Sequence, residues 1–133
     1  MAVVVGYLPT PEGRAALRRA AQECKLRRAR LVVINSNRGG KELDAAEATA
    51  YEQELDTIRA ELDSIGIANE VRQLVRGLEP AEDLISVAEE VSAEFIVIGL
   101  RRRSPVGKLI LGSNAQRILL DAPCPVLAVK AEA

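Results

Sequence analysis

The segment from Gly99 to Asn114 combines residue types that are suited to binding an anion. It follows an apolar run, holds three glycines and four basic residues without an acidic one, and ends where a helical pattern begins. The first turn of a helix has amide N–H groups without helical partners and a partial positive charge, so phosphate oxygens bind there readily. Gly112 permits close approach of the backbone, and the hydroxyl of Ser113 can donate to a phosphate or cap the helix. The segment therefore predicts a phosphate-binding loop.

Composition excludes several kinds of catalytic site. The 133-residue chain contains no histidine, so it has neither a Ser-His-Asp or Cys-His nucleophile pair nor a histidine-ligated metal. The loop is also not a Walker loop, since no GK[ST] tripeptide ends it, and it lacks GxGxxG. The two cysteines, Cys24 and Cys124, form no CxxC pair, and we expect both to be buried structural thiols. We name no catalytic residue and no metal ligand.

Apolar runs separated by helical patterns describe the elements that must position this loop. Four continuous apolar runs, at residues 3–6, 31–34, 95–98 and 126–129, are typical of strands buried on both faces of a parallel sheet. A fifth run, at residues 67–75, is interrupted by polar residues, as expected of an edge strand. Apolar residues at helical spacing lie between successive runs, with Pro80 at the start of the third helix and Ser113 capping the fourth.

This order predicts one α/β domain spanning residues 1–133. Right-handed crossovers between five parallel strands favour a doubly wound open sheet with the four helices on both faces. In the strand order 3-2-1-4-5, a crevice opens between the carboxyl ends of the first and fourth strands, bordered by residues 7–12 and 99–113. The N-terminus has no basic region typical of a secretory signal, and no apolar run is long enough for a membrane helix, so we expect a cytoplasmic protein.

The loop spacing and the end of the chain resemble the universal stress protein family. Nucleotide-binding members carry G-x2-G-x9-G-[ST] after the fourth strand, and Gly99, Gly112 and Ser113 keep that spacing here. The run from Gly112 to Val129, with its Ala-Pro-Cys-Pro-Val ending, resembles the family's last helix and strand. The resemblance covers the whole chain in length and element order. It implies the adenine nucleotide alpha hydrolase-like fold, with five parallel strands in the order 3-2-1-4-5 and four helices.

The resemblance also implies an adenine nucleotide, ATP or AMP, in the crevice, with magnesium accompanying a triphosphate. Tyr7, Leu8 and Pro9 are then expected to border the ribose, and Ser36 to lie near the base. The residues expected to hold the phosphates are Gly99, Arg102, Gly112, Ser113 and Asn114.

Two positions depart from the family's motif. Arg102 replaces the second glycine, and its side chain either crowds the phosphates or adds charge to their binding site. Leu8 stands where the family has an aspartate that is expected to meet the ribose hydroxyls. Losing that acceptor weakens binding by about 1.5 to 3 kcal/mol, or roughly tenfold to a hundredfold. A second interpretation of Arg101 to Arg103 is a solvated loop without a ligand.

The last strand predicts a homodimer. Its four residues are as apolar as a central strand, although the expected order places them at an edge with unpaired N–H and C=O groups. In the universal stress protein family the last strands of two chains pair, and the tail from Lys130 to Ala133 is too short and polar to cover the edge. We therefore expect a dimer through Val126, Leu127, Ala128 and Val129.

These patterns predict a dimeric regulatory module of the stress response that binds an adenine nucleotide. The departures at Leu8 and Arg102 favour one alternative, a nucleotide-free dimeric interaction module. Slow nucleotide hydrolysis is another alternative, although Glu12, the acidic residue nearest the crevice, is explained by its place at a helix start. Nucleic-acid binding is not expected, because three aromatic residues in the whole chain offer almost no stacking surface for bases.

Overall fold

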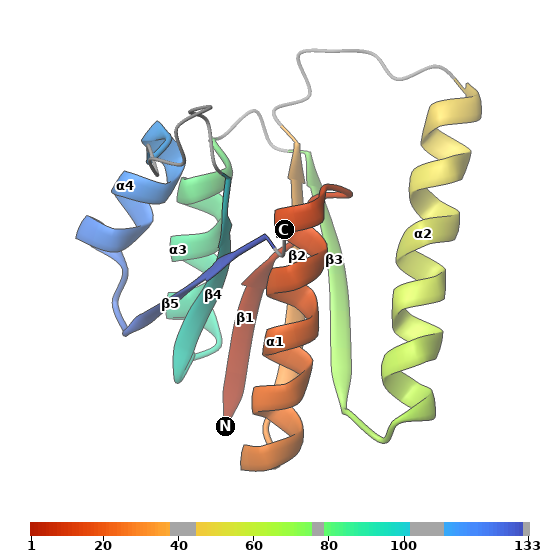
Figure 1. Cartoon of the computed structure of the whole chain (residues 1–133), viewed down its shortest axis with the longest axis horizontal. Helices are drawn as coiled ribbons and strands as arrows, with labels where there is room; N and C mark the ends of the chain where they lie inside the picture. Colours follow the sequence, from red (N-terminus) through yellow and green to blue (C-terminus); the bar gives the residue numbers. More distant parts are fainter. Residues whose placement is uncertain (38–44, 76–78, 102–110, 132–133) are drawn as a thin grey trace.

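The computed structural model has one open five-stranded sheet with helices on both faces (Figure 1). It describes residues 1–37, 45–75, 79–101 and 111–131. Strands and helices alternate along the chain as β1 Ala2–Gly6, α1 Pro11–Arg27, β2 Arg30–Asn37, α2 Ala45–Ser64, β3 Asn69–Val75, α3 Pro80–Glu90, β4 Phe95–Leu100, α4 Ser113–Asp121 and β5 Val126–Lys130. Among these described helices, none is both long and apolar enough to cross a membrane.

All strand pairs are parallel, and the sheet order is β3-β2-β1-β4-β5, which confirms the predicted order 3-2-1-4-5. β1 pairs with β2 on one side and with β4 on the other, so the chain changes winding direction at β1. In such sheets a ligand crevice forms at the carboxyl ends of the two strands that flank the change. This geometry brings the segments after β1 and β4 together, although they are far apart in the sequence.

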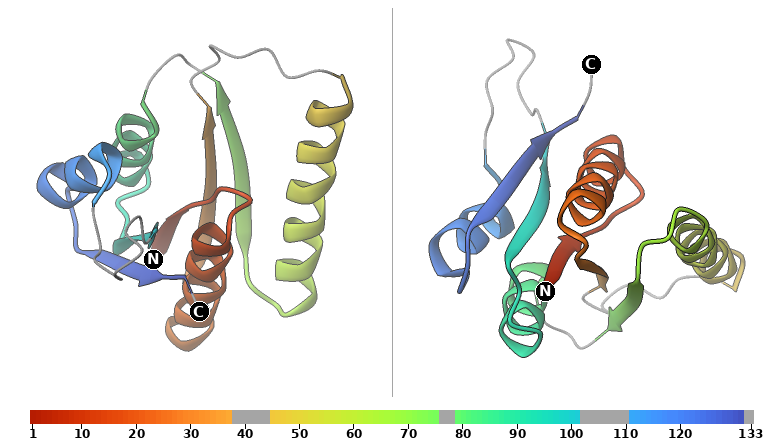
Figure 2. Two further views of the ribbon diagram at one scale, coloured as in Figure 1. Left: turned by 45° about the horizontal axis from the view of Figure 1, so that its top comes forward. Right: turned by 90° about the horizontal axis from the view of Figure 1, so that it is seen from below.

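The hydrophobic core consists of two layers, one on each face of the sheet. Helices α1 and α2 cover one face, and α3 and α4 cover the other (Figure 2). Because successive side chains of a strand point to opposite faces, Val3 and Val5 pack in the first layer and Val4 in the second. The central strands β1, β2 and β4 are buried on both faces, as their continuous apolar runs predict. The same prediction for residues 126–129 is wrong, because β5 lies at the edge of the sheet and its residues are partly or fully exposed.

The helix starts follow the expected chemistry in two cases and differ in a third. Thr10 caps α1, since its Oγ1 accepts a hydrogen bond of 3.1 Å from the Gly13 N–H. Pro80 begins α3, as predicted. The prediction that Ser113 caps α4 is wrong, because the helix begins at Ser113 and the cap position belongs to Gly112, whose backbone is extended. The first amide groups of α4 therefore receive no side-chain cap from Gly112.

The two cysteines differ in burial. Cys24 is fully buried in α1, and burial, with the nearby Glu23 charge, raises the pKa of its thiol to about 11. Cys124, in contrast, is half-buried, and its partial burial raises the pKa of its thiol as well. Both thiols are free. The expectation of a buried structural thiol is thus confirmed for Cys24, whereas Cys124 stays partly exposed because it precedes the edge strand β5.

Candidate functional site

A cavity of about 160 Å³ opens at the carboxyl ends of β1, β2 and β4. Most of its wall is apolar, and we refer to it as the apolar cavity. Five of the lining residues were predicted as site residues, namely Tyr7, Leu8, Ser36, Gly99 and Asn114. The other lining residues come from strand ends and from the first two turns of α3 and α4: Gly6, Ile34, Pro80, Leu84, Ile98, Ala115 and Ile118.

A second cavity, of about 380 Å³, adjoins the first, and we refer to it as the polar cavity. The two cavities share Leu8, Gly99, Asn114 and Ala115 as lining residues. The polar cavity is also lined by the start of α1, the end of β4 and the start of α4, through Thr10, Glu12, Leu100, Arg101, Gly112 and Ser113. Together the two cavities form the predicted crevice between β1 and β4.

The structure brings together most of the residues that the sequence singled out. Gly112 and Ser113 line the polar cavity, and Tyr7 and Ser36 line the apolar one. Pro9 is not among the lining residues of either cavity. Arg102, for which the sequence left two roles open, lies outside the described residues.

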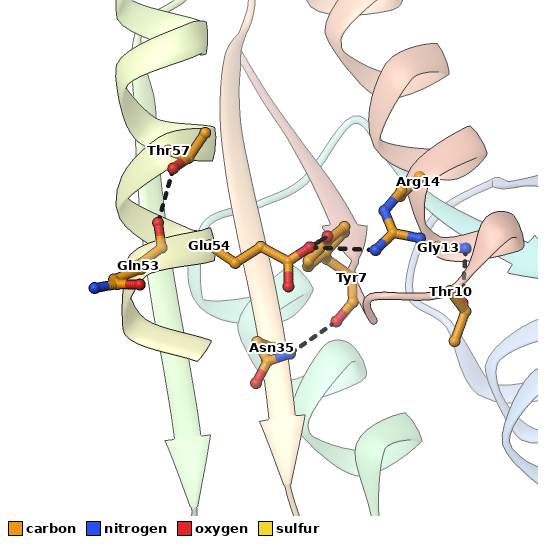
Figure 3. A network of polar contacts seen from close by, with 8 residues as sticks. All are labelled: Tyr7, Thr10, Gly13, Arg14, Asn35, Gln53, Glu54 and Thr57. Atoms are coloured by element: carbon orange, nitrogen blue, oxygen red, sulfur yellow. Dashed lines mark hydrogen bonds and ion pairs between the residues drawn. The ribbon is translucent and has the colours of Figure 1, made fainter. Parts of the chain in front are cut away.

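Tyr7 contributes its main chain to the apolar cavity, while its ring lies on the other face of the sheet. The ring packs with α1 and α2 in the first core layer, and its hydroxyl donates a hydrogen bond to Glu54 of α2 (Figure 3). Arg14 lies 3.7 Å from the same carboxylate. Burial, followed by the bond to Glu54 and its charge, raises the pKa of Tyr7 well above its usual range.

The main chain of Tyr7 is held from β2. Its N–H donates to the Ile34 carbonyl at 2.9 Å, and its own carbonyl accepts from Asn35 Nδ2 at 3.1 Å. Asn35 is almost fully buried. These contacts fix the direction in which the chain leaves β1, and so they position Leu8, which lines both cavities.

A Tyr7→Phe variant tests the bond between Tyr7 and Glu54. We expect its free energy of unfolding to fall by about 1 to 2 kcal/mol, since a hydrogen bond to a charged group is lost. The wild type should also lose stability above about pH 10, because only the unfolded tyrosine ionises readily there, whereas the variant lacks this loss. Urea denaturation between pH 7 and pH 11 measures both effects. Identical alkaline slopes would contradict the assignment.

Gly99 has a packing role that its place in the loop motif does not reveal. A Cβ atom at this position would lie 2.3 Å from the Glu12 carbonyl oxygen, far inside van der Waals contact. Glycine therefore allows the start of α1 to pack directly on the end of β4. Glu12 and Gly99 both line the polar cavity, so this close approach forms part of its wall.

Asn114 connects the first turns of α3 and α4. Its Oδ1 accepts a hydrogen bond of 3.1 Å from the Ala81 N–H, which satisfies one of the amide groups that begin α3. An ion pair of 2.8 Å between Arg117 and Glu82 joins the same two helices. Because its side-chain oxygen Oδ1 already accepts this bond, Asn114 can offer a ligand the two hydrogens of Nδ2 as donors.

Sequence reasoning missed Asp83, which is fully buried in the first turn of α3 and accepts a hydrogen bond from the Ser36 hydroxyl. An acidic residue in the turn that follows Pro80 is explained by the helix dipole, so no separate feature of the sequence pointed to Asp83. No local sequence pattern links Asp83 to Ser36, which lies 47 positions earlier in the chain. The apolar lining residues were missed for a similar reason, because they look like ordinary core residues.

Residues 1–130 match the model of the universal stress protein family. The chain belongs to the universal stress protein family. It is 45% identical over 128 residues to a universal stress protein of Mycolicibacterium smegmatis, covering 96% of each chain. Its fold is similar to that of a universal stress protein from Archaeoglobus fulgidus, with 37% identity, a TM-score of 0.82 and 98% of each chain covered.

A second universal stress protein structure from Archaeoglobus fulgidus is described as a complex with dAMP. It is 30% identical to the present chain, with a TM-score of 0.76 and 98% of each chain covered. These comparisons confirm the family and the fold that the loop spacing and the Ala-Pro-Cys-Pro-Val ending predicted.

Proposed function

We propose that this universal stress protein binds an adenine nucleotide and acts as a dimeric regulatory module of the stress response. The observation that supports the ligand is the junction of an apolar and a polar cavity at the carboxyl ends of β1 and β4. A purine ring needs a largely apolar slot, and phosphates need donors and positive charge. The base would occupy the apolar cavity and the phosphates the polar cavity. A relative that is 30% identical is described as a complex with dAMP.

The polar cavity offers the groups that phosphates require. α4 begins in its wall, so the amide groups of the first turn and the positive end of the helix dipole lie beside it. Ser113 and Arg101 are exposed there and add a hydroxyl and a guanidinium group. Glu12 adds a negative charge to the same wall. A triphosphate would therefore bind together with magnesium, whose charge offsets that of the carboxylate.

Leu8 changes what the site can recognise in the sugar. It is 48% exposed and lines both cavities, but its side chain cannot accept a hydrogen bond from a ribose hydroxyl. Discrimination between ribose and deoxyribose should therefore be weak. We expect AMP and dAMP to bind with affinities within about threefold of each other, because the bond that would separate them is missing.

Calorimetric titration of the nucleotide-stripped full chain tests this proposal. AMP, dAMP and ATP with magnesium are titrated separately near physiological salt. We expect one nucleotide per chain with micromolar affinity. No heat up to millimolar nucleotide at two temperatures would overturn the proposal and would favour a nucleotide-free interaction module.

The dimer is supported by a difference between the two edges of the sheet. β3, at one edge, carries Arg72 in ion pairs of 2.6 Å with both Glu70 and Glu90, and such charges discourage pairing with another chain. β5, at the other edge, is an apolar run from Val126 to Val129 in which Ala128 is exposed. A second copy of β5 is the partner that we propose for this edge.

An Ala128→Pro variant tests the dimer. The Ile96 N–H bonds to the Pro125 carbonyl at 3.0 Å, and peptide groups alternate in direction along a strand, so the Ala128 N–H points away from β4. Proline removes this outward donor and leaves the pairing with β4 in place. We expect sedimentation velocity to show a dimer for the wild type and a monomer for the variant. A wild type that sediments as a monomer at all concentrations would contradict the proposal.

A further inference from the structure

The apolar cavity contains few side chains that could read a base. Of the described residues that line it, Tyr7, Ser36 and Asn114 have polar side chains. The Tyr7 hydroxyl is bound to Glu54 on the opposite face of the sheet. Asn114 lines both cavities and uses its carbonyl oxygen to accept from Ala81, so it offers donors at the junction between them. Ser36 is thus the side chain in this set that can accept a hydrogen bond from a base.

The hydrogen atom of the Ser36 hydroxyl has a fixed direction. It is donated to Oδ2 of Asp83, whose side chain is fully buried in the first turn of α3. The positive end of the helix dipole favours a negative charge at that position, and a carboxylate can only accept hydrogen bonds. The Ser36 oxygen therefore keeps its two lone pairs for other partners. A hydroxyl that can usually donate or accept is held here as an acceptor.

We propose that Ser36, held as an acceptor by Asp83, selects purines that carry an amino group at position 6 over purines that carry an oxo group there. Adenine presents a donor at this position, whereas hypoxanthine and guanine present an acceptor. An acceptor facing the Ser36 lone pairs leaves both groups without a partner in an apolar cavity, which is unfavourable. Ser36 is then the specificity-determining residue, and Asp83 is a positioning residue that acts through it. The inference rests on the proposed function, because it assigns the base to the apolar cavity.

The experiment compares AMP with IMP, which differ in the base only at the 6-position and the adjoining N1 proton. Affinities are measured by competition against one fluorescent adenine nucleotide. For the wild type we expect AMP to bind roughly tenfold to a hundredfold more tightly than IMP. Ser36→Ala should weaken AMP binding and bring the ratio of the two affinities close to one. Ser36→Thr is the matched control, because it keeps the hydroxyl and should keep the preference for AMP.

Asp83→Asn tests the positioning role. The asparagine amide can donate to the Ser36 oxygen, which frees the hydroxyl hydrogen to point into the cavity. The preference should then shift toward IMP, an effect that a purely structural role of Asp83 would not produce. Thermal melts establish whether each variant is folded. If Asp83→Asn does not fold, the comparison of Ser36→Ala with Ser36→Thr decides the matter alone.

The outcomes separate this inference from the proposed function. If the wild type binds AMP and the ratio of AMP to IMP affinity is unchanged in Ser36→Ala, the selectivity role is overturned and nucleotide binding stands. A wild type that binds neither AMP nor IMP overturns both. A ratio that collapses in Ser36→Ala and persists in Ser36→Thr supports both.

Discussion

Replacing Gly99 with alanine is expected to lower the free energy of unfolding by about 3 kcal/mol, at the upper end of the usual cost of overpacking. The added Cβ would lie 2.3 Å from the Glu12 carbonyl oxygen and 2.7 Å from its carbonyl carbon. Both are backbone atoms at the start of α1, so no side-chain rotation can relieve the overlap. The start of α1 must move away from β4 instead. Since Glu12 and Gly99 both line the polar cavity, nucleotide affinity should fall as well.

Gly6→Ala provides the matched control. Gly6 ends the neighbouring strand β1 and also lines the apolar cavity, but its added Cβ would meet the Leu84 side chain, with Cδ1 at 2.9 Å. A flexible side chain can move, so we expect a smaller loss of about 1 kcal/mol. Urea denaturation followed by circular dichroism measures both variants. Equal losses, or no loss for Gly99→Ala, would show that contact with the backbone of α1 does not decide the identity of residue 99.

Filling the apolar cavity should weaken nucleotide binding strongly without unfolding the protein. Ala115 lies in the first turn of α4, is partly exposed, and lines both cavities. In an Ala115→Phe variant, the ring would occupy the space proposed for the base. Losing the buried contacts of the base should cost about 3 kcal/mol or more, which corresponds to at least roughly a hundredfold in affinity. Calorimetric titration with AMP measures the loss.

Leu120→Phe is the control for this variant. Leu120 lies on the same helix but is 84% exposed, and it lines neither cavity. It should bind AMP like the wild type, and both variants should keep the wild-type melting temperature within a few degrees. Wild-type affinity in a folded Ala115→Phe variant would exclude the apolar cavity as the site of the base.

The strands of the sheet could be predicted from the sequence because their patterns of apolar and polar residues are clear. Continuous apolar runs mark strands that are buried on both faces, and the polar residues around Arg72 mark the edge strand β3. The apolar pattern alone is compatible with several strand orders. The resemblance to universal stress proteins implied the order that the structure shows. The bounds at helix starts were less certain, as Ser113 shows, because the cap depends on backbone angles that residue type determines only loosely.

The position of the crevice was predicted from the sequence, but the arrangement of its side chains was not. Topology places the ends of β1 and β4 side by side, which is why Leu8 and Gly99 were expected to border the crevice, whereas Asn114 was expected there from the resemblance to the family; all three line the cavities. It does not say which way each side chain points. For Tyr7 a signal was present, because alternation along the strand from Val3 and Val5 carries the ring to the face of α1 and α2.

Pairings between distant residues were not predictable from local patterns. Ser36 and Asp83 are 47 positions apart and meet only because α3 crosses the face of the sheet beside β2. The contact between Gly99 and the backbone of Glu12 is even more remote in sequence. Both contacts depend on how the helices pack on the sheet. The periodicity of apolar residues predicts which face of a helix is buried, but not which residues that face contacts.

The central claim is that an adenine nucleotide binds in the crevice at the carboxyl ends of β1 and β4. Isoleucine methyl groups report on it directly, because Ile34, Ile98 and Ile118 line the apolar cavity, whereas Ile58 and Ile65 line a separate groove between α1 and α2. In a methyl NMR titration with AMP, we predict large, saturable shifts at the first three and none at the other two. Shifts confined to Ile58 and Ile65, or no shifts at millimolar AMP, would contradict the claim.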